Sequence, residues 1–174
     1  MLKDKKQKIL ESALKLFANE GFNAVSTSKI AKEAEVSEGL IFRHYKSKKG
    51  LLDAVLAMGV EKIQGYFEPI ISEKSPTETI RKAIELPFLV DEQEYHFWKL
   101  QFKLKWEMEY SSSQKTAPLI TKLTWAFTAL GYEEPHKEAE LLNHIVESIS
   151  GGILKDGLQS QLFLKEFLIN KYLN

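Results

Sequence analysis

The chain has 174 residues, 44% of them hydrophobic and 28% charged, a composition that excludes collagen-like and disordered proteins and allows a buried core. The absence of cysteine excludes disulfide frameworks, thiol catalysis and cysteine-based zinc sites. The first ten residues are charged and polar, and no run of about eighteen apolar residues occurs. We therefore expect a soluble, cytoplasmic protein with neither a secretory signal nor a membrane-spanning helix.

The net charge of zero conceals an uneven distribution along the chain. Residues 1–50 carry 11 Lys and Arg against 6 Asp and Glu, a net charge of +5, and residues 51–174 carry 13 against 18, a net charge of −5. The front of the chain is thus the part expected to meet a polyanion, although solvated helical faces can produce the same imbalance by chance.

Apolar residues recur at intervals of three and four rather than two, which predicts an all-α fold. Hydroxyl caps from Ser26, Ser37 and Ser47 are expected to start three helices of the front half. A three-helix front and a helical bundle behind it are predicted, about nine helices in all, at about 4–20, 27–34, 38–45, 48–69, 77–89, 92–110, 118–131, 133–155 and 159–173.

Proline, glycine and polar runs set the expected ends of these helices. Pro69 is expected to end the helix that Ser47 starts, and Pro87 to bend or end the next one. The polar run 111–116 is expected to form a loop, after which Pro118 opens a helix that Gly131 closes.

Two short helices joined by a tight turn and preceded by a longer amphipathic helix form a helix-turn-helix. In this motif the second helix lies in the major groove of DNA, and its N-terminal residues reach base edges. The second helix here is the segment EGLIFRHY, 38–45. Gly39 would let the backbone approach a phosphate closely, and Arg43 and His44 can donate hydrogen bonds to phosphates or bases.

The segment 21–51, GFNAVSTSKIAKEAEVSEGLIFRHYKSKKGL, resembles the DNA-binding domain of the TetR family of bacterial transcriptional regulators. The matching residues are Gly21-Phe22, Ile30-Ala31 with Ala34, Val36-Ser37 with Gly39, the aromatic-X-His-aromatic run 42–45, and Ser47-Lys48 before Leu51. The resemblance implies a helix-turn-helix domain at 1–46 and a helical effector-binding and dimerisation domain at 47–174. It implies a homodimeric repressor that binds palindromic operator DNA and is released by a small, largely apolar or aromatic effector, with no cofactor, metal or membrane partner.

Carried over position by position, the resemblance also implies which residues meet DNA. Residues 26–29 would contact the DNA backbone and one base at most. Ser37 and residues 39–45 would lie at the groove, and Lys48 would hold a phosphate at a helix N-terminus. The set comprises Ser26, Thr27, Ser28, Lys29, Ser37, Gly39, Leu40, Phe42, Arg43, His44, Tyr45 and Lys48.

This sequence departs from the family pattern at four positions. Leu40 stands where a small residue or Thr is usual, and would contact a thymine methyl group instead of donating a hydrogen bond. Phe42 replaces a Tyr whose hydroxyl commonly reaches a phosphate. Glu35 replaces the usual turn glycine and Lys29 the usual acidic residue, which affects the turn geometry and the capping box.

Aromatic residues concentrate in the second half of the chain, since 10 of 19, including all three Trp, lie between Phe88 and Tyr132. At helical spacing one stripe of the helix at 92–110 can serve the core, and a second stripe could line a ligand cavity with Gln101 or Lys105 as its polar group. Packing against a neighbouring helix is the alternative for each aromatic residue. The candidate cavity residues are Met58, Phe67, Phe88, Trp98, Gln101, Phe102, Lys105, Trp106, Trp125 and Phe127.

The last two predicted helices carry more apolar residues than one buried face needs, which favours a dimer surface. Gly151 and Gly152 would each cost about 1 kcal/mol inside a helix, which indicates a close helix approach or a bend unless the helix ends at Gly151. The candidate dimer residues are Leu142, Ile145, Val146, Ile149, Gly152, Ile153, Leu162, Phe163 and Phe167.

Two other classes of function remain as alternatives. A helical adaptor or ligand-binding protein without DNA binding would retain the bundle but not the spacing of residues 26–48. An enzyme is the least expected class, because Glu133 and His136 form the only metal-like pair, Pro135 interrupts it, and a helical di-iron site needs two such pairs.

Overall fold

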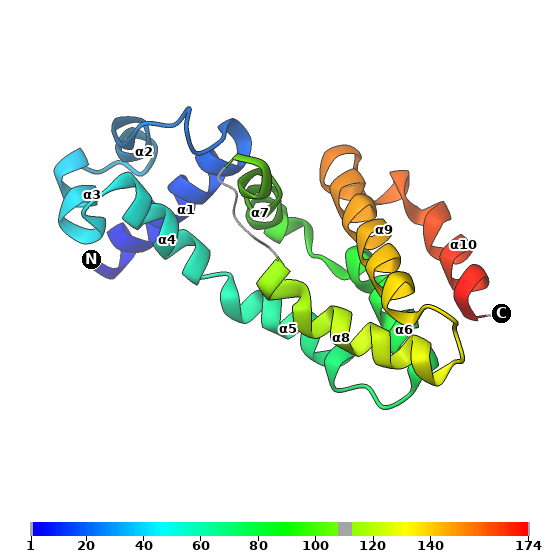
Figure 1. Ribbon diagram of the computed structural model, residues 1–174. Helices are drawn as coiled ribbons and strands as arrows, with labels where there is room; N and C mark the ends of the chain where they lie inside the picture. Colours follow the sequence, from blue (N-terminus) through cyan, green and yellow to red (C-terminus); the bar gives the residue numbers. More distant parts are fainter. Residues whose placement is uncertain (1, 108–112, 174) are drawn as a thin grey trace. The chain divides into compact units, whose positions relative to one another are not determined.

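The structure is a computed structural model that describes residues 2–107 and 113–173. Within these ranges the chain forms ten α-helices and three short 3-10 helices and no strand, which confirms the all-α fold class (Figure 1). The chain divides into two compact units, Met1–Lys62 with Gln93–Tyr110, and Ile63–Glu92 with Ser111–Asn174. The first compact unit extends beyond residue 46, because the helices at 48–57 and 95–107 pack on the helix at 2–20. The functional division expected at residue 46 therefore stays a prediction.

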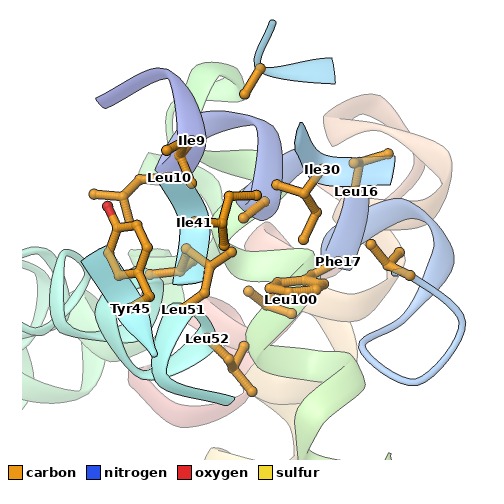
Figure 2. Close-up of a cluster of buried hydrophobic side chains, with 14 of the residues drawn as sticks. Ile9, Leu10, Leu16, Phe17, Ile30, Ile41, Tyr45, Leu51, Leu52 and Leu100 are labelled. Atoms are coloured by element: carbon orange, nitrogen blue, oxygen red, sulfur yellow. The ribbon is translucent and has the colours of Figure 1, made fainter. Parts of the chain in front are cut away.

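The first unit is built around α1 (Leu2–Glu20), which packs against α2 (Thr27–Glu33), α4 (Lys48–Ala57) and α7 (Tyr95–Glu107). The apolar stripe of α1 faces inward because its members recur at three and four. In Figure 2 this stripe meets side chains of α2, α3 (Glu38–Tyr45), α4 and α7 in one buried cluster, whose labelled members are Ile9, Leu10, Leu16, Phe17, Ile30, Ile41, Tyr45, Leu51, Leu52 and Leu100.

Two of the three predicted serine caps are confirmed. The Ser26 hydroxyl accepts a hydrogen bond from the backbone N of Lys29 at 3.1 Å, and the Ser47 hydroxyl accepts one from Gly50 N at 2.9 Å. Ser37 occupies the position before α3, but its side chain makes no capping hydrogen bond. The Ser37 hydroxyl is therefore not used to hold the helix.

The single helix expected from Ser47 to Pro69 is divided in two, which corrects the prediction. The helix α4 ends at Ala57 and α5 (Val60–Ile71) follows, with Pro69 inside its last turn rather than at its end. At the break, Gly59 N donates to Leu56 O at 3.0 Å, an i−3 rather than an i−4 bond. A Cβ on Gly59 would lie 1.8 Å from the Phe97 ring, so the close approach of α7 requires glycine here.

The second unit contains α6 (Pro76–Glu85), α8 (Ser113–Ala129), α9 (Pro135–Asp156) and α10 (Leu162–Leu173), with 3-10 turns at Leu86–Leu89 and Leu158–Ser160. The Ser75 hydroxyl caps α6 through Glu78 N, and the helix gives way to the 3-10 turn that contains Pro87, as predicted for this proline. A further 3-10 turn, Glu92–Glu94, precedes α7, so the helix expected from 92 begins at Tyr95.

The polar run 111–116 is not a loop over its described part, because residues 113–116 belong to α8; residues 111–112 lie outside the described ranges. The prediction that Pro118 opens this helix is wrong, because α8 begins at Ser113 and contains Pro118, whose missing N–H removes a single hydrogen bond. Gly131 closes the helix as predicted: its φ is 80°, Gly131 N donates to Thr128 O and Tyr132 N to Phe127 O, the pair of bonds of a Schellman motif.

The helix α9 continues through Gly151 and Gly152 and ends before Gly157, whose φ is 87°, so the alternative of a helix end at Gly151 is wrong. A Cβ on Gly152 would lie 2.7 Å from the Gln161 side chain, which explains the glycine as a close approach within the chain. Four of the expected dimer residues also belong to the core of this unit, because that face of α9 packs on α8: Leu142, Val146, Ile149 and Ile153.

None of the helices in the described ranges combines the length and the apolar character that crossing a bilayer demands.

Candidate nucleic-acid interface

The turn between α2 and α3 has the geometry of a helix C-terminal cap. Glu35 N donates to Lys32 O at 3.2 Å and Val36 N to Ala31 O at 2.9 Å, the two bonds of a Schellman motif. Glu35 occupies the left-handed position of this motif, with φ 55°. The chain thus makes the helix-turn-helix turn with a glutamate in a conformation that favours glycine.

The helix α3 has one buried and one open face. Ile41 and Tyr45, four residues apart, point into the cluster that also holds Ile9 and Leu10 of α1 (Figure 2). Gly39, Phe42 and Arg43 lie on the exposed surface, with 45% of Phe42 accessible. The buried pair fixes the helix to its unit and leaves the opposite side free for a partner.

The expectation that Tyr45 lies at the groove is wrong, because its ring is a core residue. Tyr45 is 8% exposed, and its hydroxyl donates to the backbone O of Lys6 at 3.3 Å. Burial raises the pKa of the Tyr45 hydroxyl. His44 is half-buried, and its Nε2 atom is enclosed with no hydrogen-bond partner among the described residues.

Gly39 has no role in the packing of its own unit. A Cβ at this position would meet no described atom within 4 Å, and the residue is exposed. Internal packing therefore does not account for a glycine in the first turn of α3, where it costs helix stability. Close approach of an external backbone, such as a DNA strand, would account for the glycine.

Three hydroxyls near the two helix starts are in different states. Ser26 accepts from Lys29 N, which leaves its hydroxyl hydrogen for another acceptor. Ser37 is exposed and makes no capping bond. The Thr27 hydroxyl already donates its hydrogen to Glu38 Oε1 at 2.6 Å, so it has none left for a phosphate in this arrangement.

The two lysines predicted at the DNA are engaged within the chain. Lys29 Nζ pairs with Glu20 Oε2 at 2.5 Å on the surface. Lys48 Nζ donates to Phe22 O at 2.8 Å and to Val25 O at 2.9 Å, and lies 4.4 Å from the centroid of the Phe22 ring. The Lys48 amine thus holds the loop between α1 and α2 against the start of α4.

Two predicted residues remain, Ser28 and Leu40, and a third residue, Lys46, was not predicted. Ser28 is exposed, and Leu40 is half-buried against the core cluster. Lys46, which follows α3 and is exposed with φ 63°, was not among the predicted DNA contacts. The basic run from Lys46 to Lys49 was the sequence signal for it. The pairing of Thr27 with Glu38 had no sequence signal, because it joins residues on different helices.

The structure divides the candidate cavity residues between the two units. In the first unit Trp98, Gln101 and Phe102 are half-buried along α7, and Met58 is 41% exposed. Gln101 Nε2 is enclosed and has no hydrogen-bond partner within the described ranges. The side chains of Lys105 and Trp106 lie outside the described residues.

In the second unit Phe67 and Phe88 are half-buried, and Trp125 is 42% exposed with Lys122 Nζ 3.9 Å from its ring centroid. Phe127 is fully buried between the rings of Tyr132 and Tyr172, at centroid distances of 4.9 and 5.7 Å. Phe127 is thus a core residue, as the packing alternative allowed.

Comparison with known proteins gives the motif a family. Residues 9–55 match the family model for bacterial regulatory proteins of the tetR family. The HTH-type transcriptional regulator YerO of Bacillus subtilis is 32% identical over 91 residues, which cover 50% of this chain and 31% of YerO. The HTH-type transcriptional regulator YttP of the same organism is 26% identical over 94% of this chain and 81% of YttP. The alignments with YerO and two further B. subtilis regulators span only 31%, 27% and 27% of those relatives.

Solved structures share the fold over nearly the whole chain. A TetR-like transcriptional regulator from Rhodococcus sp. RHA1 has a TM-score of 0.79 and 20% identity, with 96% of this chain and 94% of that chain covered. AibR, solved with isovaleryl coenzyme A and operator DNA, has a TM-score of 0.70 and 17% identity, with 96% and 97% covered. These relatives are transcriptional regulators and not enzymes, as expected for this chain. Residues 9–55 thus match the helix-turn-helix region of the tetR family of bacterial regulatory proteins, and the chain shares its fold with the solved TetR-like regulators.

Proposed function

We propose that this protein is a repressor that binds a palindromic operator as a homodimer through the exposed face of α3 and is released by a small, largely apolar or aromatic effector. The observation that carries the proposal is the two-sided character of α3, with Ile41 and Tyr45 buried and Gly39, Phe42 and Arg43 open. A helix held in this way can enter a major groove without losing its own packing. Such a regulator acts in the bacterial cytoplasm, where the chromosome lies.

Several residues of this surface would contact the phosphates of DNA. Arg43 and Lys46 carry exposed positive charge on and directly after α3, and Ser26 and Ser37 keep hydroxyl hydrogens for phosphate oxygens. Gly39 has no side chain and would let the backbone of α3 come close to a phosphate. In this proposal residues 1–46 read the DNA, and residues 47–174 carry the effector and dimer contacts.

The experiment that tests DNA binding is a gel-shift titration against fragments of the host genome at several salt concentrations. Binding to a subset of fragments is expected, with affinity that falls steeply as salt rises because phosphate contacts release counterions. Arg43→Ala should weaken binding at least about tenfold. The matched control is Lys137→Ala, which removes an exposed lysine on α9 in the second unit and should bind as the unsubstituted protein does. Equal binding by both variants would overturn the assignment of the face.

The homodimer part of the proposal rests on α9 and α10. Leu141 is 50% exposed on α9, and Phe163 and Phe167 are 68% and 61% exposed on α10. With Leu162 and the half-buried Ile145, these side chains give α9 and α10 exposed apolar residues that a two-fold contact with a second copy would cover. Sedimentation of the double variant Phe163→Glu, Phe167→Glu should give a monomer where the unsubstituted protein gives a dimer, and a dimer in both would remove this surface from the proposal.

The effector part of the proposal rests on the half-buried aromatic side chains of α7. Trp98 and Phe102 lie four residues apart with Gln101 between them, whose Nε2 has no partner in the described part of the chain. An apolar surface with one available amide suits an apolar ligand that carries a single polar group. AibR, of similar fold, was solved with an acyl coenzyme A and operator DNA. Native mass spectrometry of the purified protein should detect a bound small molecule, and addition of that molecule should release DNA.

A further inference from the structure

One short hydrogen bond joins the starts of the two helices of the DNA-binding motif. The Thr27 hydroxyl, on the first residue of α2, donates to Glu38 Oε1, on the first residue of α3, at 2.6 Å. This length is typical of a hydroxyl bound to an ionised carboxylate, which is a strong interaction. Both residues are half-buried, so the bond fixes the direction of the Glu38 side chain.

Among the described residues, the partner of this carboxylate is a hydroxyl and not a cationic side chain. No Lys, Arg or His within the described ranges forms an ion pair with Glu38, whose partner is a neutral hydroxyl. The second oxygen, Oε2, makes no hydrogen bond with the described residues. An ionised carboxylate only accepts hydrogen bonds. Beside DNA it repels the phosphates, so a hydrogen-bond donor of a base edge is the group of the nucleic acid that would favour it.

The major groove offers such a donor at specific bases. The N-terminal residues of a recognition helix are those that reach base edges, and Glu38 is the first residue of α3. Cytosine presents its N4 amino group in the major groove, and Glu and Asp are the side chains that accept from it. Gly39, the next residue, has no side chain to hold the helix start away from the groove.

We propose that Glu38 is a specificity-determining residue that accepts a hydrogen bond from the amino group of a cytosine in each half of the operator, and that Thr27 is the positioning residue that orients it. The inference rests on the proposed DNA-binding function and deepens it. It predicts a preference for cytosine, which phosphate contacts of the basic residues do not provide, because such contacts are independent of sequence.

The test is selection of bound duplexes from a random pool, with sequencing, for the unsubstituted protein and four variants. The unsubstituted protein should enrich a palindrome with a cytosine at one symmetric position, preferred about tenfold or more over other bases. Glu38→Gln should lose cytosine there and accept adenine, because a glutamine amide pairs with adenine N6 and N7. Thr27→Val, which removes the hydroxyl, should weaken the cytosine preference, and Thr27→Ser should retain it. Glu33→Gln, an equal charge change on α2, should leave the preference unchanged.

The outcomes separate the inference from the proposed function. Enrichment of a palindrome whose base preferences are the same for Glu38→Gln and the unsubstituted protein would overturn the role of Glu38 and leave operator binding in place. Equal preferences for Thr27→Val and Thr27→Ser would overturn the positioning role of Thr27. Enrichment of no sequence by the unsubstituted protein would overturn both operator binding and the inference. Circular dichroism of each variant establishes that it is folded before selection.

Discussion

At the scale of single residues, backbone conformation marks both ends of the recognition helix. Within the described ranges, Glu35 and Lys46 are the residues other than glycine with positive φ, at 55° and 63°, and α3 lies between them. An L-residue with a Cβ is disfavoured in this region by about 1–2 kcal/mol. The turn therefore retains its geometry at an energetic cost, with stability supplied by the buried side chains around it.

Glu35→Gly should stabilise the protein by about 0.5–1 kcal/mol, because glycine removes the backbone strain of the folded state. The greater conformational entropy of glycine in the unfolded chain cancels only part of this gain. The side chain is 82% exposed, and its pair with Lys8 at 3.8 Å contributes little. Urea unfolding followed by circular dichroism measures the change. Glu35→Ala removes the same carboxylate but keeps the Cβ, and should give no such gain; equal gains in both variants would contradict the strain argument.

Glu73 gives a second prediction at this scale, one that depends on pH. The Lys82 amine and the backbone N–H groups of Ser75 and Lys74 all donate to its carboxylate, and together they lower the pKa of Glu73 from 4.5 to about 2. The ionised form is thus favoured in the folded state. Its contribution to stability is complete above pH 4.5 and is lost as the pH falls through about 2.

The variant Glu73→Gln should accordingly be less stable than the unsubstituted protein near neutral pH, and the difference should shrink as the pH falls below 4.5. Urea unfolding at several pH values between about 3 and about 7 measures this difference. Glu134→Gln, which removes an exposed carboxylate paired with Lys137, should change stability little. A difference for Glu73→Gln that stays constant with pH would contradict the assignment.

At the scale of elements, Gly39 allows stability and DNA binding to be separated. Gly39→Ala should stabilise α3 by up to about 1 kcal/mol, since the added Cβ meets no described atom within 4 Å. The same methyl group should weaken DNA binding by holding the helix start away from the phosphates. Thermal unfolding and gel-shift titration of the same preparation measure the two effects.

The matched control for this variant lies in α5. Gly65 is exposed, inside a helix and equally free of described neighbours within 4 Å. Gly65→Ala should therefore raise stability by a similar amount and leave DNA affinity unchanged. If Gly39→Ala were more stable and bound DNA with undiminished affinity, close approach of DNA at this glycine would be excluded.

Most elements could be predicted from the sequence because their signals are local. The caps at Ser26, Ser47 and Ser75 and the closure at Gly131 depend on residues within one turn of each other. The close approach that requires glycine at residue 59 could not be predicted, because it involves the Phe97 ring, which comes from another helix. Local signals also fail where a polar run joins a helix, as at residues 113–116.

The candidate site was predicted in part for the same reason. The open face of α3 follows from helical spacing, whereas the burial of Tyr45 against α1 and the use of the Lys48 amine by the loop at residues 22–25 depend on tertiary contacts. On α9 the apolar excess was read as a dimer surface, but Leu142 and three others fill the core of the second unit. Composition counts apolar side chains and does not say which element covers them.

At the scale of the whole molecule, a two-fold dimer would present two copies of α3 to one face of DNA. Successive major grooves on that face lie about 34–36 Å apart, which sets the distance between the two helices in the bound state. A ligand that favours another distance weakens binding, and a coupling of about 1–3 kcal/mol changes the affinity by about 5- to 150-fold. In the proposed dimer only the DNA-bound form needs this spacing, so an effector and the operator would compete through conformation.

Affinity cleavage tests most directly whether α3 enters the groove. The chain has no cysteine, so Ser37→Cys and, as a control, Ser148→Cys each provide a single attachment point for an iron chelate that cleaves nearby DNA. Both positions are exposed, the first at the start of α3 and the second on α9. With an operator fragment identified by gel shift, the chelate at residue 37 should cut at two places about 10 base pairs apart, and the chelate at residue 148 should not cut. Bound operator that is left intact by the chelate at residue 37, or is cut by the one at residue 148, would contradict the account.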